Sequence, residues 1–114
     1  GVAREALEET ARIFTPEALV GVYLARLRRE STAEDITYLR FAICGAAGEA
    51  LPGHMLDAPI ERTLWMTLDE IRASRARHRS PLLLRCVEDH AAGHRHALKL
   101  LATDASVWAP SPTE

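Results

Sequence analysis

Three histidines near the end of the chain form the clearest chemical pattern in the sequence: His90, His94 and His96. Residues four apart on a helix lie one turn apart on the same face, so His90 and His94 are spaced to bind one metal ion. Such a site needs at least one more ligand, and the glutamate that separates the two histidines of metal-dependent hydrolases is missing. The alternative is a pair of partly buried, hydrogen-bonded histidines in a core or a dimer interface. We predict that alternative, and with it no bound metal and no other cofactor.

The two cysteines, Cys44 and Cys86, each lie in an apolar stretch. They are too few and too isolated for a zinc site or a disulfide framework, which indicates buried free thiols in a reducing compartment. On a helix, Cys86 and His90 could touch, but neither cysteine has the electropositive neighbours that activate a thiol as a nucleophile. We therefore predict no catalytic residues and no enzyme activity.

The run from Arg72 to Arg79 is the most basic part of the chain. Short arginine-rich runs can bind nucleic acid or phosphate, but cations also gather at the carboxyl end of a helix because they favour its dipole. Asp69 and Glu70 stand directly before the run, and the formal net charge of the chain is −2. We predict a solvated corner or a patch for an acidic protein partner, and no direct contact with nucleic acid.

Length and composition limit the class of protein. A chain of 114 residues has the size of one domain, and 47% hydrophobic residues with a net charge of −2 exclude a disordered chain. Charged residues recur throughout, so no apolar stretch is long enough to span a membrane. Glu5, Glu8 and Glu9 lie where a secretory leader would have its basic and apolar regions. The sequence therefore predicts a cytoplasmic protein that makes no membrane contact.

Helix caps divide the chain into segments. Thr15-Pro16 and Ser80-Pro81 each combine an N-cap residue with a proline at the first helical position, and residues 31–34 fit a capping box. Apolar residues recur between these caps at three- and four-residue steps, which is typical of amphipathic helices. The predicted helices cover residues 2–14, 16–29, about 32–47, 57 into the arginine run, and 81–103. The alternative for residues 37–44 is a strand, because aromatic and β-branched residues are frequent there.

This layout predicts an all-α fold, a compact bundle of about five amphipathic helices that bury their apolar stripes against one another. Residues 1–103 form a single helical domain in this interpretation. Residues 104–114, which include two prolines, form an irregular C-terminal tail. Trp108 in that tail is expected to fold back onto the domain.

The apolar stripe predicted for residues 16–29 is so wide that this helix needs more than one neighbouring element to pack against. A well-packed monomer core is one source of that neighbour, and a second copy or a partner protein is the other. We predict a protein partner and a homodimer. The residues predicted to bind the partner are Val20, Tyr23, Leu24 and Leu27 on the stripe, with Arg72, Arg75 and Arg79 as an electrostatic rim.

In size, composition and helix layout, the chain resembles the small proteobacterial quorum-sensing antiactivators of the QslA type. The resemblance implies a non-enzymatic bacterial regulator that binds a LuxR-type transcription factor and blocks its dimerisation and DNA binding. Two other classes remain open: a metal- or cofactor-binding helical bundle that uses His90 and His94, and a small enzyme whose site is assembled across a dimer.

Overall fold

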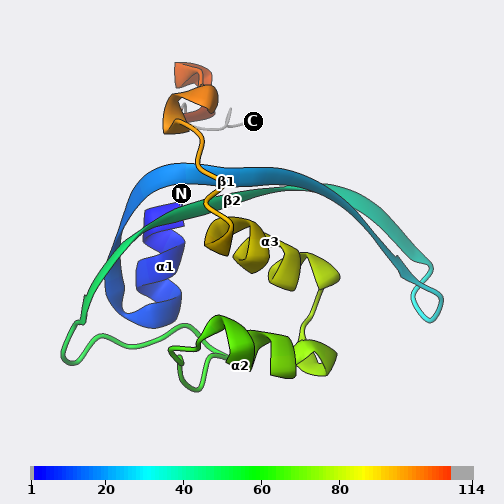
Figure 1. The fold of residues 1–114 in the computed structure, drawn as a ribbon, viewed down its shortest axis with the longest axis horizontal. Helices are drawn as coiled ribbons and strands as arrows, with labels where there is room; N and C mark the ends of the chain where they lie inside the picture. Colours follow the sequence, from blue (N-terminus) through cyan, green and yellow to red (C-terminus); the bar gives the residue numbers. More distant parts are fainter. Residues whose placement is uncertain (1, 109–114) are drawn as a thin grey trace, which may run out of the picture.

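A long β-hairpin dominates the structure, a computed structural model that describes residues 2–108 (Figure 1). The helix α1 (Val2–Thr10) precedes the two antiparallel strands, β1 (Arg12–Arg29) and β2 (Glu34–Ala50). After an irregular segment come α2 (Leu68–Ala73), the 3₁₀ turn η1 (Arg75–Arg77), α3 (Pro81–Ala91), η2 (Leu98–Leu100) and η3 (Ala105–Trp108). The prediction of an all-α bundle is therefore wrong, because the described chain combines a β-sheet with helices.

The hairpin replaces the two helices that were predicted over residues 16–29 and 32–47. Its turn is residues 30–33, where Ala33 has a φ of 55°, so residues 31–34 form the turn and the first residue of β2 and not the capping box predicted there. Tyr23 and Leu27 lie four residues apart, a spacing that keeps side chains on one face of a helix and also of a strand. The sequence pattern was thus compatible with both structures. The strand that remained an alternative for residues 37–44 lies within β2.

Pro16 lies inside β1, where it faces Gly45 across the sheet. The pairing register shifts between Pro16 and Ala18, so a β-bulge accommodates the proline, which cannot donate a ladder hydrogen bond. The backbones approach closely there, since a Cβ atom on Gly45 would collide with the carbonyl oxygen of Thr15. Thr15-Pro16 therefore marks a bulge in a strand and not the start of a helix.

The helices α2 and α3 of the C-terminal half each begin at a side chain that caps the N-terminus. The Ser80 hydroxyl accepts from the Leu82 amide at 3.1 Å, which confirms the predicted start of α3. The predicted start of the preceding helix near residue 57 is wrong, because α2 begins only after Thr67. The Thr67 hydroxyl and the Glu70 carboxylate form the capping box of α2.

The helix α3 ends well before residue 103 because Gly93 adopts a left-handed conformation, with a φ of 89°. The Gly93 amide donates to the His90 carbonyl at 3.1 Å, and the His94 amide donates to the Asp89 carbonyl at 3.1 Å. This pair of hydrogen bonds is the Schellman motif that terminates helices at glycine. The chain then crosses the hairpin, and His96 exchanges two backbone hydrogen bonds with Leu19 of β1, at 2.7 and 2.8 Å.

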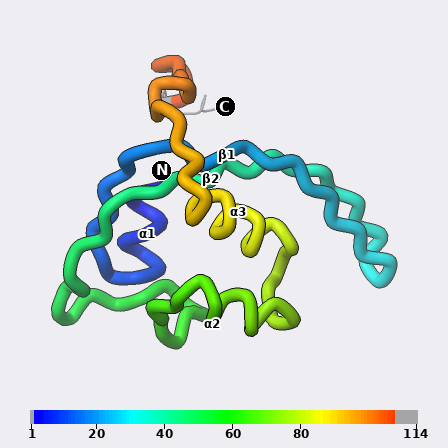
Figure 2. Tube along the Cα trace, viewed as in Figure 1, coloured from blue at the N-terminus to red at the C-terminus, as the bar shows by residue number. Residues whose placement is uncertain are grey.

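The hairpin separates the helices into two groups (Figures 1 and 2). The helices α1, α2 and α3 lie below the hairpin in this view, whereas η2 and η3 lie above it. The core is small. Among the described residues, the only buried apolar side chains are Ala11, Leu19 and Val20. The radius of gyration is 16.5 Å, against about 13 Å for a compact chain of this length. The compact core of the predicted bundle is absent from the part of the chain that the structure describes.

None of the helices among the described residues has the length and apolar character needed to cross a membrane. The predicted division at residue 103 stays a prediction. Residues 109–114 of the predicted tail and the side chain of Trp108 lie outside the described part of the chain.

Candidate functional site

Three glutamates project from the short helix α1: Glu5, Glu8 and Glu9. The helix ends at Thr10, whose hydroxyl donates to the Ala6 carbonyl at 2.6 Å, and Ala11 turns the chain into β1 with a φ of 59°. Glu8 is paired with Arg4 at 3.0 Å. Glu5 and Glu9 are exposed and lie four residues apart, one above the other on the helix. We call this pair the carboxylate line.

The carboxylate line has the donor chemistry of a site for a hard divalent cation. Mg²⁺ is commonly held by one or two carboxylates together with oxygens of a bound phosphate, and it seldom needs a cage made only of protein. Within residues 2–108, no three histidine, cysteine, aspartate or glutamate side chains converge into such a cage. Glu5 and Glu9 therefore fit a cation that is shared with a phosphate ligand.

A cleft lies between α1, the base of the hairpin and the segment that follows β2. Ala6, Phe14 and Ala47 give it an apolar lining, Thr63, Leu64 and Trp65 line its other side, and Thr10 and Arg12 add polar groups. We call it the α1 cleft. Two backbone hydrogen bonds tie the segment after β2 to the region of α1: Leu51 donates to the Ala11 carbonyl at 2.8 Å, and Asp57 donates to the Glu8 carbonyl at 2.9 Å.

Trp65 and Arg12 form the aromatic part of the α1 cleft. The guanidinium carbon of Arg12 lies 5.2 Å from the centre of the Trp65 ring, within the range of a cation–π contact. Arg12 also donates to the Gly48 carbonyl at 2.6 Å, which fixes the guanidinium in place. The Trp65 side chain is nevertheless 75% exposed. An indole this exposed is free to contact a ligand.

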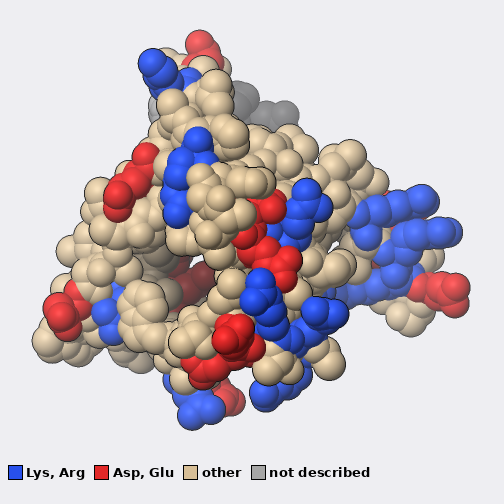
Figure 3. Space-filling model, in the orientation of Figure 1, with Lys and Arg blue, Asp and Glu red and all other residues tan. Residues whose placement is uncertain are grey.

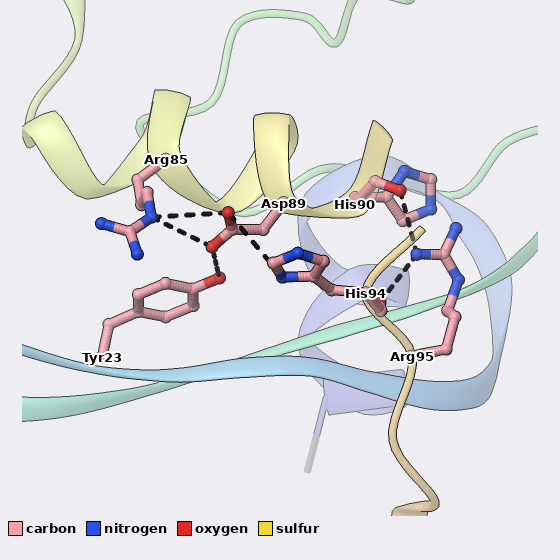
Figure 4. A network of polar contacts seen from close by, with 6 residues as sticks. All are labelled: Tyr23, Arg85, Asp89, His90, His94 and Arg95. Atoms are coloured by element: carbon pink, nitrogen blue, oxygen red, sulfur yellow. Dashed lines mark hydrogen bonds and ion pairs between the residues drawn. The ribbon is translucent and has the colours of Figure 1, made fainter. Parts of the chain in front are cut away.

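A second polar cluster joins the hairpin to α3 (Figure 4). The Tyr23 hydroxyl, from β1, donates to the Asp89 carboxylate of α3 at 2.6 Å. Arg85 donates to the same carboxylate at 3.2 Å, and the ring of His94 lies 3.9 Å from it. The hydrogen bond from Tyr23, followed by Arg85 and His94, lowers the pKa of Asp89 against the opposing effect of burial. Burial and the bond to Asp89 raise the pKa of Tyr23. These contacts anchor α3 to the hairpin.

The metal-binding arrangement of His90 and His94, which the sequence left as an alternative, does not form. Because α3 ends before Gly93, His94 lies beyond the helix and does not sit one turn above His90. The ring of His94 turns towards Asp89, whereas His90 lines a second cleft of about 350 Å³ with Cys44 and Arg95. Among the described residues the two histidines belong to no metal cluster. Both cysteines are free and half-buried, and burial is the main cause that raises the pKa of Cys86.

The residues predicted to bind a partner do not share one surface. Val20 is buried, and Tyr23 and Leu27 are half-buried on the face of β1 opposite to Leu24. Leu24 is 70% exposed. The stripe predicted for a helix is thus split between the two faces of a strand. No finding tests whether any of these residues contacts a partner.

The predicted arginine rim lies at the α2–α3 corner of the molecule. Arg72, Arg75 and Arg79 are exposed, and Arg72 pairs with Glu88 of α3 at 3.2 Å and with Asp69 at 3.5 Å. Figure 3 shows basic side chains around this corner and also at the tip of the hairpin. Arg72 therefore helps to hold α2 against α3.

Sequence reasoning overlooked both parts of the site on α1. It used Glu5, Glu8 and Glu9 only to exclude a leader, although three carboxylates at spacings of three and four on a short helix already indicated a cation-binding face. Trp65 falls within the helix predicted from residue 57, but the structure has no helix before Leu68, and no pattern in the sequence brings residue 65 next to residue 12.

The chain is similar to the solved structure of a NUDIX hydrolase from Nitrosomonas europaea. The two share 42% sequence identity and superpose with a TM-score of 0.78. The match covers 90% of this chain and 66% of that one, so this chain spans just under two thirds of the length of the hydrolase. No protein-family model and no curated protein matches the chain.

This similarity overturns the functional predictions made from the sequence. The chain is not similar to a quorum-sensing antiactivator but to a hydrolase, so the prediction of a non-enzymatic transcription regulator is wrong. The prediction that the protein is no enzyme is overturned by the same finding. The metal-binding bundle built on His90 and His94 is not supported either.

Proposed function

We propose that this chain belongs to the NUDIX hydrolases and that it hydrolyses the phosphate–phosphate linkage of a nucleoside diphosphate compound. The observation that carries the proposal is the 42% identity to a NUDIX hydrolase over 90% of the chain. The carboxylate line of α1, with the α1 cleft beside it, is the part of the structure that best fits such a substrate.

Electrostatics explains why the carboxylates would act through a cation. Glu5 and Glu9 are exposed carboxylates without a basic partner among the described contacts, so on their own they repel a diphosphate. A divalent cation held by these carboxylates would turn this repulsion into attraction and would supply the charge that polarises the phosphoryl oxygens. Arg4 neutralises Glu8, which leaves Glu5 and Glu9 as the ligands we assign to the cation.

The chain's own side chains have two tasks in this reaction. Hydrolysis joins the oxygen of water to one phosphorus and breaks its bond to the bridging oxygen, which leaves with the other phosphate. A carboxylate of α1 that does not bind the cation is suited to take the proton from the attacking water. The α1 cleft would hold the rest of the substrate, and in doing so would fix the diphosphate beside the helix.

The test is a hydrolysis assay with a panel of nucleoside diphosphate compounds, with and without Mg²⁺. We expect turnover that requires the cation, stops on addition of a chelator and returns when Mg²⁺ is restored. Turnover that is unaffected by the chelator would show that the carboxylate line does not act through a cation.

We also propose a cellular location and an oligomeric state for the protein, both of which the sequence predicts. We place the protein in the cytoplasm, which agrees with the absence of a membrane-crossing helix among the described residues. We also retain a homodimer, without direct binding of nucleic acid or membrane.

A further inference from the structure

We propose that the α1 cleft binds the planar heteroaromatic ring of the substrate and that Trp65 stacks on this ring. The inference rests on the proposed function and assigns a specificity-determining residue to it. It names the part of the substrate that the cleft selects, which neither the similarity to a hydrolase nor the carboxylate line determines.

The size and lining of the cleft fit a ring better than a whole nucleotide. Its volume is about 180 Å³, below the ~300–1,000 Å³ of sites that enclose an entire small molecule. The lining that Ala6, Phe14 and Ala47 provide is apolar, as the face of a ring requires. Thr10 and Thr63 are also among the lining residues, and a threonine hydroxyl is a hydrogen-bonding group of the kind that the edge of a ring requires.

The aromatic wall is arranged for stacking. Arg12, held by the Gly48 carbonyl at 2.6 Å, lies over the Trp65 ring at 5.2 Å. The Trp65 side chain is still 75% exposed, so most of the indole surface can receive a flat ligand. Arg12 covers one face of the indole, and a heteroaromatic ring can stack on the exposed part that Arg12 leaves open.

The position of the cleft relative to the carboxylates gives the orientation of the substrate. Ala6 and Thr10 line the cleft from α1, and each directly follows a glutamate of the carboxylate line. Successive residues are about 100° apart around a helix, so the carboxylate line flanks the side of α1 that forms the cleft. A ring in the cleft therefore places an attached diphosphate along Glu5 and Glu9.

The first experiment measures ring binding without hydrolysis. In a Trp108→Phe background, Trp65 is the sole tryptophan, and its fluorescence is titrated with free nucleosides that carry no phosphate. We expect saturable quenching by at least one nucleoside and none by ribose. Quenching that rises linearly without saturation for every nucleoside would overturn the proposal, because it indicates random collisions with an exposed indole.

The second experiment separates ring recognition from phosphate chemistry. Hydrolysis of a nucleoside diphosphate compound and of a diphosphate with a saturated alkyl group is compared for Trp65→Ala, Trp65→Leu and Trp65→Phe. Stacking of a base on an aromatic side chain is worth enough to raise KM for the nucleoside compound about 5- to 150-fold in the alanine and leucine variants. We expect no change for the alkyl diphosphate and recovery in the phenylalanine variant.

The matched control is Met66→Ala, which removes the neighbouring exposed side chain that does not line the cleft. Equal losses on both substrates, or leucine as effective as phenylalanine, would contradict a stacking role. If the wild-type protein hydrolyses neither diphosphate, the proposed function fails, and the nucleoside titration still decides whether the cleft binds a ring.

Discussion

The glutamates of α1 differ in what surrounds them, and this difference sets their roles. Glu8 is half-buried and paired with Arg4, whereas Glu5 and Glu9 are exposed on one line of the helix. The histidines show the opposite case, because Gly93 removes the helical spacing that would have brought His90 and His94 together. Two residues four positions apart lie side by side only where the backbone between them is helical.

Replacing Glu9 by glutamine tests the carboxylate line, because it removes one negative charge and hardly changes the size of the side chain. We expect Glu9→Gln to lower kcat/KM for hydrolysis by about 10²-fold or more, because it removes the charge of one of the two carboxylates assigned to the cation. Since Glu9 is exposed, the free energy of unfolding should stay within about 0.5 kcal/mol of the wild type. Glu30→Gln, at the exposed turn of the hairpin, is the control and should keep full activity.

The Tyr23–Asp89 contact predicts how stability changes in acid. The pKa of Asp89 is lowered from its ordinary value of 3.8, so its ionised form stabilises the folded state above that pH. This contribution is lost as the pH falls below 3.8 through the lowered pKa of the folded state. Urea unfolding between pH 6 and pH 2.5 should therefore show a smaller acid loss in Tyr23→Phe than in the wild type. Tyr38→Phe is the control, and an equal acid loss in all three proteins would show that this contact carries no pH dependence.

At the scale of elements, the caps of the C-terminal half could be predicted and the hairpin could not. Ser80-Pro81 is a local feature, and α3 begins there as predicted. The choice between helix and strand for residues 16–29 is not local, because a four-residue apolar spacing suits both. It is decided by pairing with residues 34–50, for which the sequence contains no local marker. The end of α3 is also local, because Gly93 adopts the left-handed conformation that terminates helices.

The bulge around Pro16 gives a direct test of the hairpin. Gly45→Ala should lower the free energy of unfolding by about 1–3 kcal/mol, because the new methyl group meets the Thr15 backbone and cannot be relieved by a side-chain movement. Gly48→Ala is the matched control on the same strand, where the nearest atom to a new Cβ is the Ile13 carbonyl oxygen at 3.6 Å. The control should be neutral or stabilising by up to about 1 kcal/mol. Equal effects in urea unfolding would contradict the close approach at the bulge.

At the scale of the whole molecule, the hairpin leaves apolar side chains uncovered. Val22 pairs with Phe41 and Leu24 pairs with Leu39, and all four side chains are exposed on the same face of the sheet. We call these four residues the outward patch. The sequence predicts an apolar stripe over residues 16–29 that a second copy or a partner protein covers, and this contact stays a prediction. The interpretation of the stripe as helical was wrong, since only Leu24 of the predicted partner-binding residues belongs to this patch.

The predicted homodimer can be tested at the outward patch. Leu24→Arg should leave the fold intact, with a change in unfolding free energy within about 0.5 kcal/mol, because the side chain is 70% exposed. If the patch joins two copies, sedimentation analysis should find a dimer for the wild type and a monomer for the variant. Glu17→Arg, also exposed on β1 but outside the patch, is the control. A wild-type protein that stays monomeric at high concentration would contradict the homodimer.

The central claim is that the carboxylate line of α1 supports cation-dependent hydrolysis of a nucleoside diphosphate compound. Its most direct measurement is the release of phosphate products by the purified chain in the presence of Mg²⁺, for the wild type and for Glu9→Gln. We expect release by the wild type that needs Mg²⁺ and falls by about 10²-fold or more in the variant. Release that is equally fast in both proteins, or no release by the wild type from any compound of the panel, would contradict it.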